Sequence, residues 1–236
     1  DFVQYDSNIL IENGKYVVEE NGPFMAGLKS GEFIQSAGTS FSTPIITHDA
    51  GVIHNQYPSY TTNTIRALLT HFSDEIKAEQ ITNEDMKKRL VGFGMPNIEK
   101  ALYSLSNAAT IVIEDIIGIN KMKKIKIPIP ASLAGDHRKR LKILMTLAYN
   151  PLINPKDVEK YNPIVMRANL VRPDHKIVTS GSTRDKMSDA YLKSNIKKYP
   201  PLETSTKANT GAFWEIVVTS ETRSDDIPPD YKQKYS

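Results

Sequence analysis

The sequence predicts an α/β domain followed by an antiparallel, jelly-roll-like β-sandwich, because its hydrophobic periodicity changes partway along the chain. From about residue 40 to residue 103, apolar residues recur three and four positions apart, as they do in amphipathic helices. From residue 110 onward, several short runs alternate apolar and polar residues, with Pro and Asn turns between them. We therefore expect two domains, residues 1–106 and 107–236, with the boundary between Tyr103 and Thr110.

The composition is that of an ordinary globular protein and narrows the possible chemistry. The 236 residues are 39% hydrophobic and 24% charged, with a net charge of +3. There is no cysteine, which excludes disulfides, a thiol nucleophile and thiolate metal sites and favours an intracellular, cytoplasmic location. No apolar run is long enough to span a membrane, and the N-terminus lacks the features of a signal peptide. Residues 121–142 are rich in Lys and Arg, but without interleaved aromatic residues we expect no nucleic-acid partner.

Residues 1–35 alternate short apolar runs with turn residues and predict strands and loops. They lead to residues 36–44, SAGTSFSTP, where Gly38 allows a tight turn and an apolar pattern of helical spacing begins just after Ser40. We expect a helix from Ser40 to about Tyr57, apolar on more than one side and therefore central and buried. Pro44 is expected in its first turn, where a missing N–H costs no hydrogen bond.

Ser40 at a helix start has two interpretations. One is a polar turn with a helix cap, since Ser and Thr are common caps. The other is a nucleophile, because free N–H groups and the positive end of the helix dipole favour an oxyanion beside the hydroxyl.

A longer pattern supports the second interpretation. Residues 38–44, GTSFSTP, resemble the nucleophile motif of subtilisin-like serine proteases, Gly-Thr-Ser-x-(Ala/Ser)-(Ser/Ala/Thr)-Pro, at every fixed position. The following pattern, through a helix near Ala101, is also similar to that family, so the resemblance covers roughly residues 1–106.

The resemblance implies that residues 1–106 are the C-terminal third of a three-layer α/β/α catalytic domain. It implies peptide-bond hydrolysis through an acyl-enzyme on Ser40, with Gly38 and Thr39 shaping the oxyanion turn and a peptide or protein as substrate. In the family the triad Asp and His precede the serine by many tens of residues, whereas only 39 residues precede Ser40 here. We therefore expect this chain to be inert as a fragment. No cofactor is identifiable, and calcium is suggested by the resemblance alone, since no D-x-D-x-D loop occurs.

No histidine in the sequence replaces the missing base. His48 lies eight residues after Ser40, which on a helix is roughly 12 Å, too far for a contact of about 3 Å. His54 and His71 read as helix residues, and His137 and His175 lie in predicted turns. None of these histidines has metal-ligand spacing, so we predict no metal site.

The remaining elements follow in order. Thr61 or Thr62 can cap a helix that carries Ile65 and Leu68, and Asn97 opens another helix through Leu102. Strands are predicted over residues 110–113, 124–129, 141–149, 164–170 and 213–218, with a long excursion between strands at residues 179–210. A different class of function stays open: a non-catalytic binding or regulatory module, either a pseudoprotease or a β-sandwich that docks a partner.

Overall fold

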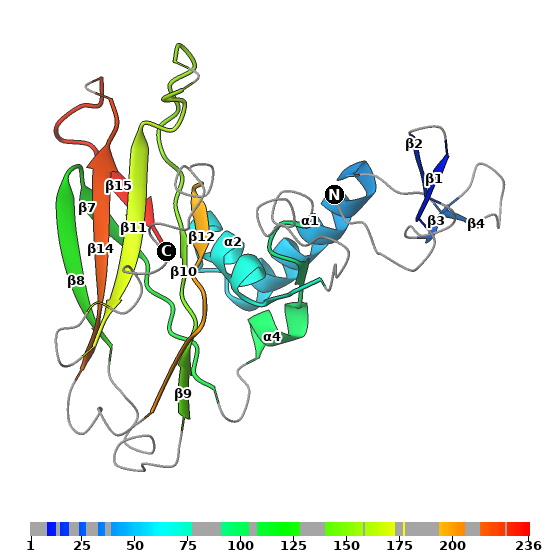
Figure 1. The fold of residues 1–236 in the computed structure, drawn as a ribbon, viewed down its shortest axis with the longest axis horizontal. Helices are drawn as coiled ribbons and strands as arrows, with labels where there is room; N and C mark the ends of the chain where they lie inside the picture. Colours follow the sequence, from blue (N-terminus) through cyan, green and yellow to red (C-terminus); the bar gives the residue numbers. More distant parts are fainter. Residues whose placement is uncertain are drawn as a thin grey trace. The chain divides into compact units, whose positions relative to one another are not determined.

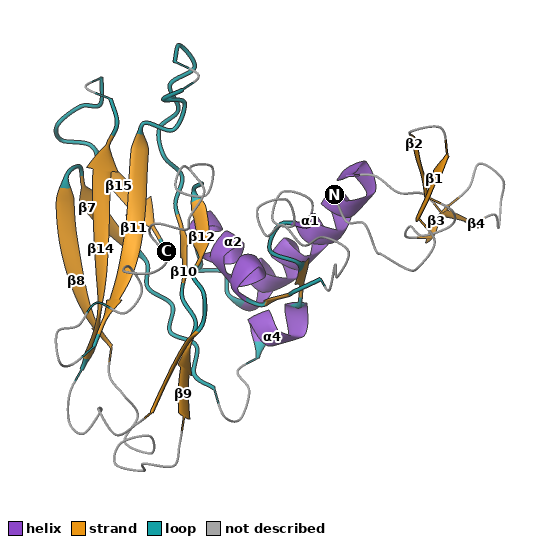
Figure 2. Ribbon diagram, in the orientation of Figure 1, coloured by secondary structure: helices purple, strands orange, loops and turns teal. Residues whose placement is uncertain are grey.

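The chain is a mixture of helices and strands with small sheets (Figure 2). The computed structural model describes residues 9–12, 15–18, 24–26, 33–35, 39–76, 91–103, 108–127, 140–157, 159–172, 177, 194–205, 213–224 and 226–236. The chain divides into two compact units. The first comprises Asp1–Ser59 with Phe72–Ser106, and the second comprises Tyr60–His71 with Asn107–Ser236. The predicted first domain, residues 1–106, included residues 60–71, which the structure assigns to the second unit.

The first unit begins with two antiparallel hairpins, in the region where strands and loops were predicted. Strand β1 (Ile9–Glu12) pairs with β2 (Lys15–Val18), and β3 (Phe24–Ala26) pairs with β4 (Phe33–Gln35). Glu12 stands opposite Lys15 across the first hairpin, and the connecting sequence is Asn-Gly, the strongest two-residue hairpin signal. The long helix α1 (Thr39–Gln56) follows.

The first unit ends in a short pair of strands and a capped helix. Strand β5 (Ser73–Asp74) pairs with β6 (Met95–Pro96), just before α4 (Ile98–Leu102). The Asn97 side chain accepts a hydrogen bond from the Lys100 N–H at 3.1 Å, so the predicted start of this helix is confirmed. Gly94 has φ +97°, and a Cβ there would lie 2.0 Å from the Asp74 carbonyl oxygen, so only glycine fits this approach.

The second unit is built from antiparallel strands and one helix, α2 (Thr62–His71) (Figure 1). Its largest described sheet has the order β11-β14-β8. The other described sheets have two strands each and pair β7 with β15, β10 with β12, and β9 with β13. The strand bounds are β7 Asp115–Gly118, β8 Lys121–Ile127, β9 Arg140–Ile143, β10 Thr146–Ala148, β11 Ile164–Val171, β12 Ile196–Lys198, β13 Leu202–Ser205, β14 Trp214–Thr222 and β15 Lys232–Tyr235.

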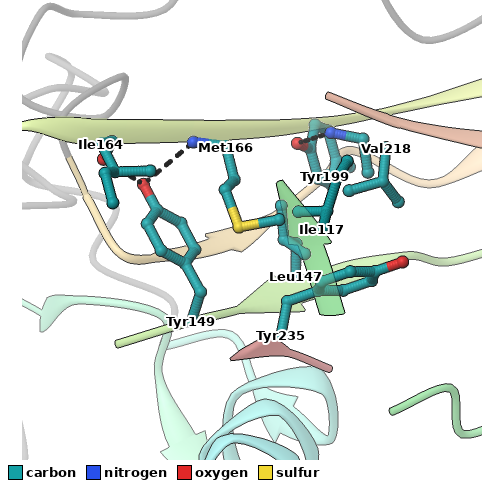
Figure 3. Packing of buried hydrophobic residues seen from close by; sticks show 9 residues of the cluster. Ile117, Leu147, Tyr149, Ile164, Met166, Tyr199, Val218 and Tyr235 are labelled. Carbon is teal, nitrogen blue, oxygen red and sulfur yellow. Dashed lines mark hydrogen bonds between the residues drawn. The ribbon is translucent and has the colours of Figure 1, made fainter. Parts of the chain in front are cut away.

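One hydrophobic cluster joins several of these sheets. It draws buried residues from β7, β10, β11, β14 and β15 and from positions next to strands: Ile117, Leu147, Tyr149, Ile164, Met166, Ala168, Tyr199, Val218 and Tyr235 (Figure 3). Two tyrosine hydroxyls in it accept hydrogen bonds from the β11 backbone, Tyr149 from the Met166 N–H at 3.3 Å and Tyr199 from the Ala168 N–H at 2.8 Å. Because β11 is at the edge of its described sheet, these hydroxyls satisfy groups that a neighbouring strand would otherwise pair.

Several predicted strands are confirmed and others are corrected. Runs 164–170 and 213–218 correspond to β11 and β14, and run 124–129 to β8, whose described part ends at Ile127. Run 141–149 is two strands, because residues 144–145 interrupt it. Residues 110–113 form no strand, and Ile111 is exposed; the strand begins only at Asp115. The predicted excursion at 179–210 contains β12 and β13 within its described part, residues 194–205. Strand β12 was not predicted because Lys197 points inward there, and a strand with an inward lysine has no alternating apolar pattern.

Candidate active site

Ser40 is the second residue of α1 (Thr39–Gln56), so the prediction that it lies at the start of a helix ending near Tyr57 is confirmed. Thr39 and Ser40 are both exposed. The first N–H groups of an α-helix have no intrahelical acceptor, and the helix dipole places positive potential around them. The Ser40 hydroxyl therefore lies beside backbone donors suited to a developing negative charge. Gly38, the third residue predicted for this turn, lies outside the described residues.

Pro44 removes a helical hydrogen bond from the Ser40 carbonyl, an effect that the sequence analysis did not predict. It lies inside α1, five residues after the helix begins, and not in the first turn where it was expected. Since proline has no N–H, the Ser40 carbonyl cannot receive the ordinary bond from the residue four positions ahead. Two threonine hydroxyls nearby also donate to carbonyl oxygens of the helix: Thr43 Oγ1 to Thr39 O at 2.8 Å, and Thr47 Oγ1 to Thr43 O at 2.9 Å. The start of the helix is thus rich in polar contacts around the serine.

The expectation that α1 is a central, buried helix is wrong for this chain. Ile53 is its one buried residue, and Ile45 is 47% exposed. The helix packs against α4, and next to its end the Tyr57 hydroxyl donates to the Leu102 carbonyl oxygen at 2.7 Å. Apolar residues on several sides of a helix indicate that it can be buried, but burial also requires surrounding chain, and the described residues of the first unit cover only the Ile53 side.

Neither histidine of α1 is placed to activate Ser40. His48 Nδ1 lies 3.5 Å from Oδ1 of its neighbour Asp49; the imidazole is exposed and the Asp49 side chain is partly buried. It is eight residues from Ser40 on the same helix, roughly 12 Å along the axis, so this imidazole cannot serve as the base. His54 is also exposed on α1, and His71 belongs to the second unit. His137 and His175 lie outside the described residues.

Other site chemistry is limited in the part of the chain that the structure describes. There, no three His, Asp or Glu residues gather as metal ligands would. None of the helices found there has both the length and the apolar character needed to cross a bilayer. The start of α1, at Thr39 and Ser40, is therefore the candidate site that we consider further.

The comparisons with known proteins agree with the motif around Ser40. Residues 20–94 match the model of the Subtilase family. This segment contains the whole of α1 and α2 and therefore both Thr39 and Ser40. It links the serine at the start of the helix to a family of peptidases through a longer stretch than the seven-residue motif alone.

Two further proteins are similar over different extents. The uncharacterized protein y4bN of Sinorhizobium fredii is 31% identical over 124 residues, which cover 50% of this chain and 28% of that protein. This chain thus spans little more than a quarter of the length of that relative. A crystal structure of the Aeromonas sobria serine protease with its chaperone aligns at 12% identity and a TM-score of 0.26, covering 82% of this chain and 38% of that one.

Proposed function

We propose that this chain is the nucleophile-bearing part of a subtilisin-like serine endopeptidase that hydrolyses peptide or protein substrates. One observation carries the proposal: Ser40 lies at the N-terminus of an 18-residue helix, inside the segment that matches the Subtilase family model. In this proposal residues 1–106 belong to the C-terminal third of an α/β/α catalytic domain, with α2 packed in the second unit. Residues 107–236 form the β-sandwich that follows it.

The chemistry assigned to Ser40 is acyl transfer. Its Oγ attacks the scissile carbonyl carbon, the hydroxyl proton passes to a general base, and the carbonyl oxygen becomes an oxyanion. The backbone N–H groups of Thr39 and Ser40 are suited to stabilise that oxyanion, because the first N–H groups of a helix have no helical acceptor, and we assign Gly38 to the same oxyanion turn. The amine then leaves with a proton from the base, and water releases the acyl group from Ser40.

The general base is assigned to a part of the protein that precedes Asp1. This assignment comes from the family resemblance, in which the triad Asp and His precede the serine, and His48, roughly 12 Å from Ser40 along one helix, is too far to replace them. The 236-residue chain alone is then inert towards peptides. The same chain, joined to a segment that supplies the Asp and His of a Ser-His-Asp triad, is expected to hydrolyse peptides.

Labelling with a fluorophosphonate probe tests the proposal. The full-length protein is compared with its Ser40→Ala variant, with Ser42→Ala as a matched control two residues along the same helix, and with the 236-residue chain. We expect labelling of the full-length protein and of Ser42→Ala. We expect no labelling of the isolated chain, and a loss of several orders of magnitude in both labelling and peptide hydrolysis for Ser40→Ala.

Each other pattern of labelling contradicts part of the proposal. Equal labelling of the full-length protein and Ser40→Ala would show that Ser40 is not the nucleophile. Strong labelling of the isolated chain would place the general base inside residues 1–236. No labelling of the folded full-length protein would favour the alternative function, a non-catalytic binding or regulatory module in which the serine motif is a relic.

A further inference from the structure

Strand β8 (Lys121–Ile127) is the end strand of the three-stranded sheet β11-β14-β8, on the side opposite β11 (Figure 1). Its sequence, KMKKIKI, contains four lysines and no acidic residue. It pairs with β14 along its whole length and has no other partner among the described strands. In the described part of the chain, the N–H and C=O groups of its outer edge therefore have no strand to bond.

The preceding strand, β7 (Asp115–Gly118), does not close this edge. Only Ile119 and Asn120 separate β7 from β8, and Asn120 has φ +54°, a left-handed conformation typical of tight turns. A two-residue connection commonly joins the paired strands of a hairpin. Here β7 pairs instead with β15, in a different sheet, and its Asp115 carboxylate pairs with Lys123. The open edge of β8 is seven residues long, about 24 Å at the usual rise of a strand.

The side chains of β8 divide between two faces of the sheet. Ile125 packs against the hydrophobic cluster of the second unit. Since side chains alternate along a strand, Met122, Lys124 and Lys126 lie on the opposite, outer face. Met122 is 62% exposed, and both lysines are exposed. The outer face of β8 thus presents one apolar side chain and two ammonium groups at alternate positions.

The two outer lysines have no ionic partner among the described residues. Glu215 of β14 stands directly opposite Lys126 in the strand register. No ion pair nevertheless joins Lys124 or Lys126 to Glu215 or to another described carboxylate. The Lys126 ammonium lies 5.8 Å from the centre of the Phe213 ring, a side chain that is itself 54% exposed. Both lysines are therefore open to a carboxylate from outside the chain.

The same charges determine which kind of strand can add to this edge. A second copy of β8 would bring lysines beside lysines, which disfavours pairing between two molecules of this chain. A strand with Asp or Glu at alternate positions would instead place one carboxylate beside Lys124 and another beside Lys126, about 7 Å apart along the strand. Its next alternate residue would lie beside Met122, where an apolar side chain fits.

We propose that β8 is a docking edge for an extended acidic segment of another protein, which adds to the sheet as an antiparallel strand. Main-chain hydrogen bonds to the open edge supply affinity, and the two lysines supply specificity. Read from Lys126 towards Met122, the matching pattern in the segment is acidic-x-acidic-x-apolar. Antiparallel pairing is assigned because it is the more stable arrangement per residue. The proposal is independent of the proposed peptidase function, because β8 belongs to the second unit and Ser40 takes no part in it.

Binding of a synthetic peptide to the 236-residue chain tests the proposal. The probe is a peptide with the central sequence Glu-Val-Glu-Thr-Leu, and NMR of the isotope-labelled chain measures both its affinity and its position. The control peptide, Val-Glu-Glu-Thr-Leu, has the same composition, but its adjacent glutamates point to opposite faces of a strand. We expect amide shifts on β8, an affinity about three-fold higher for the probe than for the control, and weaker binding as salt is added.

Paired substitutions in the chain separate the docking edge from a general attraction to a basic protein. Lys124→Gln with Lys126→Gln removes two charges from the edge. Lys156→Gln with Lys160→Gln is the matched control, because it removes two exposed charges elsewhere in the second unit. We expect the first pair to weaken binding of the probe about ten-fold and the second pair to change it by less than about two-fold. With Lys124→Glu and Lys126→Glu, the chain should prefer the reversed peptide, Lys-Val-Lys-Thr-Leu.

Four outcomes would overturn the inference. No amide shift on β8 at millimolar peptide would show that the edge does not accept a strand. Equal affinities of the probe and its isomer would show that net charge alone is recognised, and so would equal effects of the two lysine pairs. Tighter binding of a single-stranded oligothymidylate than of the probe, at the same salt concentration, would assign the lysines to nucleic acid.

Discussion

Helices α1 and α2 follow one another in the segment that matches the Subtilase family, separated only by Tyr57–Thr61, yet their environments differ sharply. In α1, 18 residues long, one residue is buried, whereas in α2, 10 residues long, five are buried. Two of those five are polar, Asn63 and Thr64. The longer helix with more apolar residues is the one left exposed.

This difference shows that the sequence pattern of a helix does not by itself determine how much of the helix is buried. The shorter helix is buried because chain from residue 114 onward supplies partners for its backbone, its polar groups and its apolar side. Glu114 accepts hydrogen bonds from the Thr61 N–H at 2.8 Å and from the Thr64 hydroxyl at its N-terminus. By contrast, the apolar residues of α1 have few described neighbours, as the 47% exposure of Ile45 shows.

The largest expected effect comes from truncating one apolar side chain on each helix. Leu68→Ala removes a side chain that is 6% exposed, and we expect the free energy of unfolding of the second unit to fall by about 3 kcal/mol. Ile45→Ala on α1 should change stability by less than about 0.5 kcal/mol, because Ile45 is largely exposed and Ala favours helix. Urea unfolding followed by circular dichroism measures both. Equal losses would mean that the two helices are equally buried in solution.

A smaller effect is expected at the carboxylate that caps α2. Burial acts to raise the pKa of Glu114, but hydrogen bonds from Thr64 and Thr61 lower it, and the net effect is a lowered pKa. Glu114→Ala should therefore cost the second unit about 1 kcal/mol at pH 7, of the order of a lost helix cap. Glu114→Gln, which keeps an acceptor oxygen, should cost less.

The sign of the pH dependence checks the assignment of Glu114. Because the pKa is lower in the folded than in the unfolded state, the stabilisation by its charge is present above the unfolded value, 4.5, and is lost as pH falls through the folded value. The difference in unfolding free energy between the protein and Glu114→Gln should therefore shrink when pH is lowered from 7 to 3. A difference that stays constant over that range would exclude a role for the carboxylate charge.

The smallest expected effect sharpens the description of α1. Gly51 lies in the interior of that helix and is exposed, and a Cβ added there would have nothing within 4 Å. Gly51→Ala should therefore stabilise the helix by up to about 1 kcal/mol. Gly92→Ala is the matched control: its Cβ would also meet nothing, but its φ is +60°, so the change should destabilise the first unit by about 1 kcal/mol. Thermal unfolding measures both, and a destabilising Gly51→Ala would indicate that α1 is not a regular helix at that point.

Local features of the fold were predictable from the sequence where they depend on neighbouring residues. The start of α1 near Ser40, that of α2 at Thr62 and the cap of α4 at Asn97 were predictable, because caps and the change to helical spacing lie within a few positions of each other. The strands β11 and β14 were readable from dense β-branched and aromatic runs. The nucleophile candidate Ser40 was found in the same way, from its seven-residue context.

Features that depend on distant partners were not predictable. The assignment of α2 to the second unit rests on contacts with Glu114, Lys234 and Ser236 that no local pattern contains. The inward position of Lys197 likewise became visible only when β12 paired with β10. A lysine in a polar stretch indicates an exposed loop, because the sequence alone does not show that a tyrosine hydroxyl and a carbonyl will be brought to its ammonium group.

The sequence by itself determined where helices begin, where the strongest strands run and which serine stands at a helix start, since these follow from steric preferences and hydrogen bonds over a few residues. Only the tertiary structure decided that α1 is exposed, that α2 is enclosed and that a lysine lies in a buried strand. The physical reason is that the burial of a helix depends on a second part of the chain that packs against it. A side chain leaves water only when another part of the chain covers it, and in α2 that part lies up to 172 residues away, at Ser236.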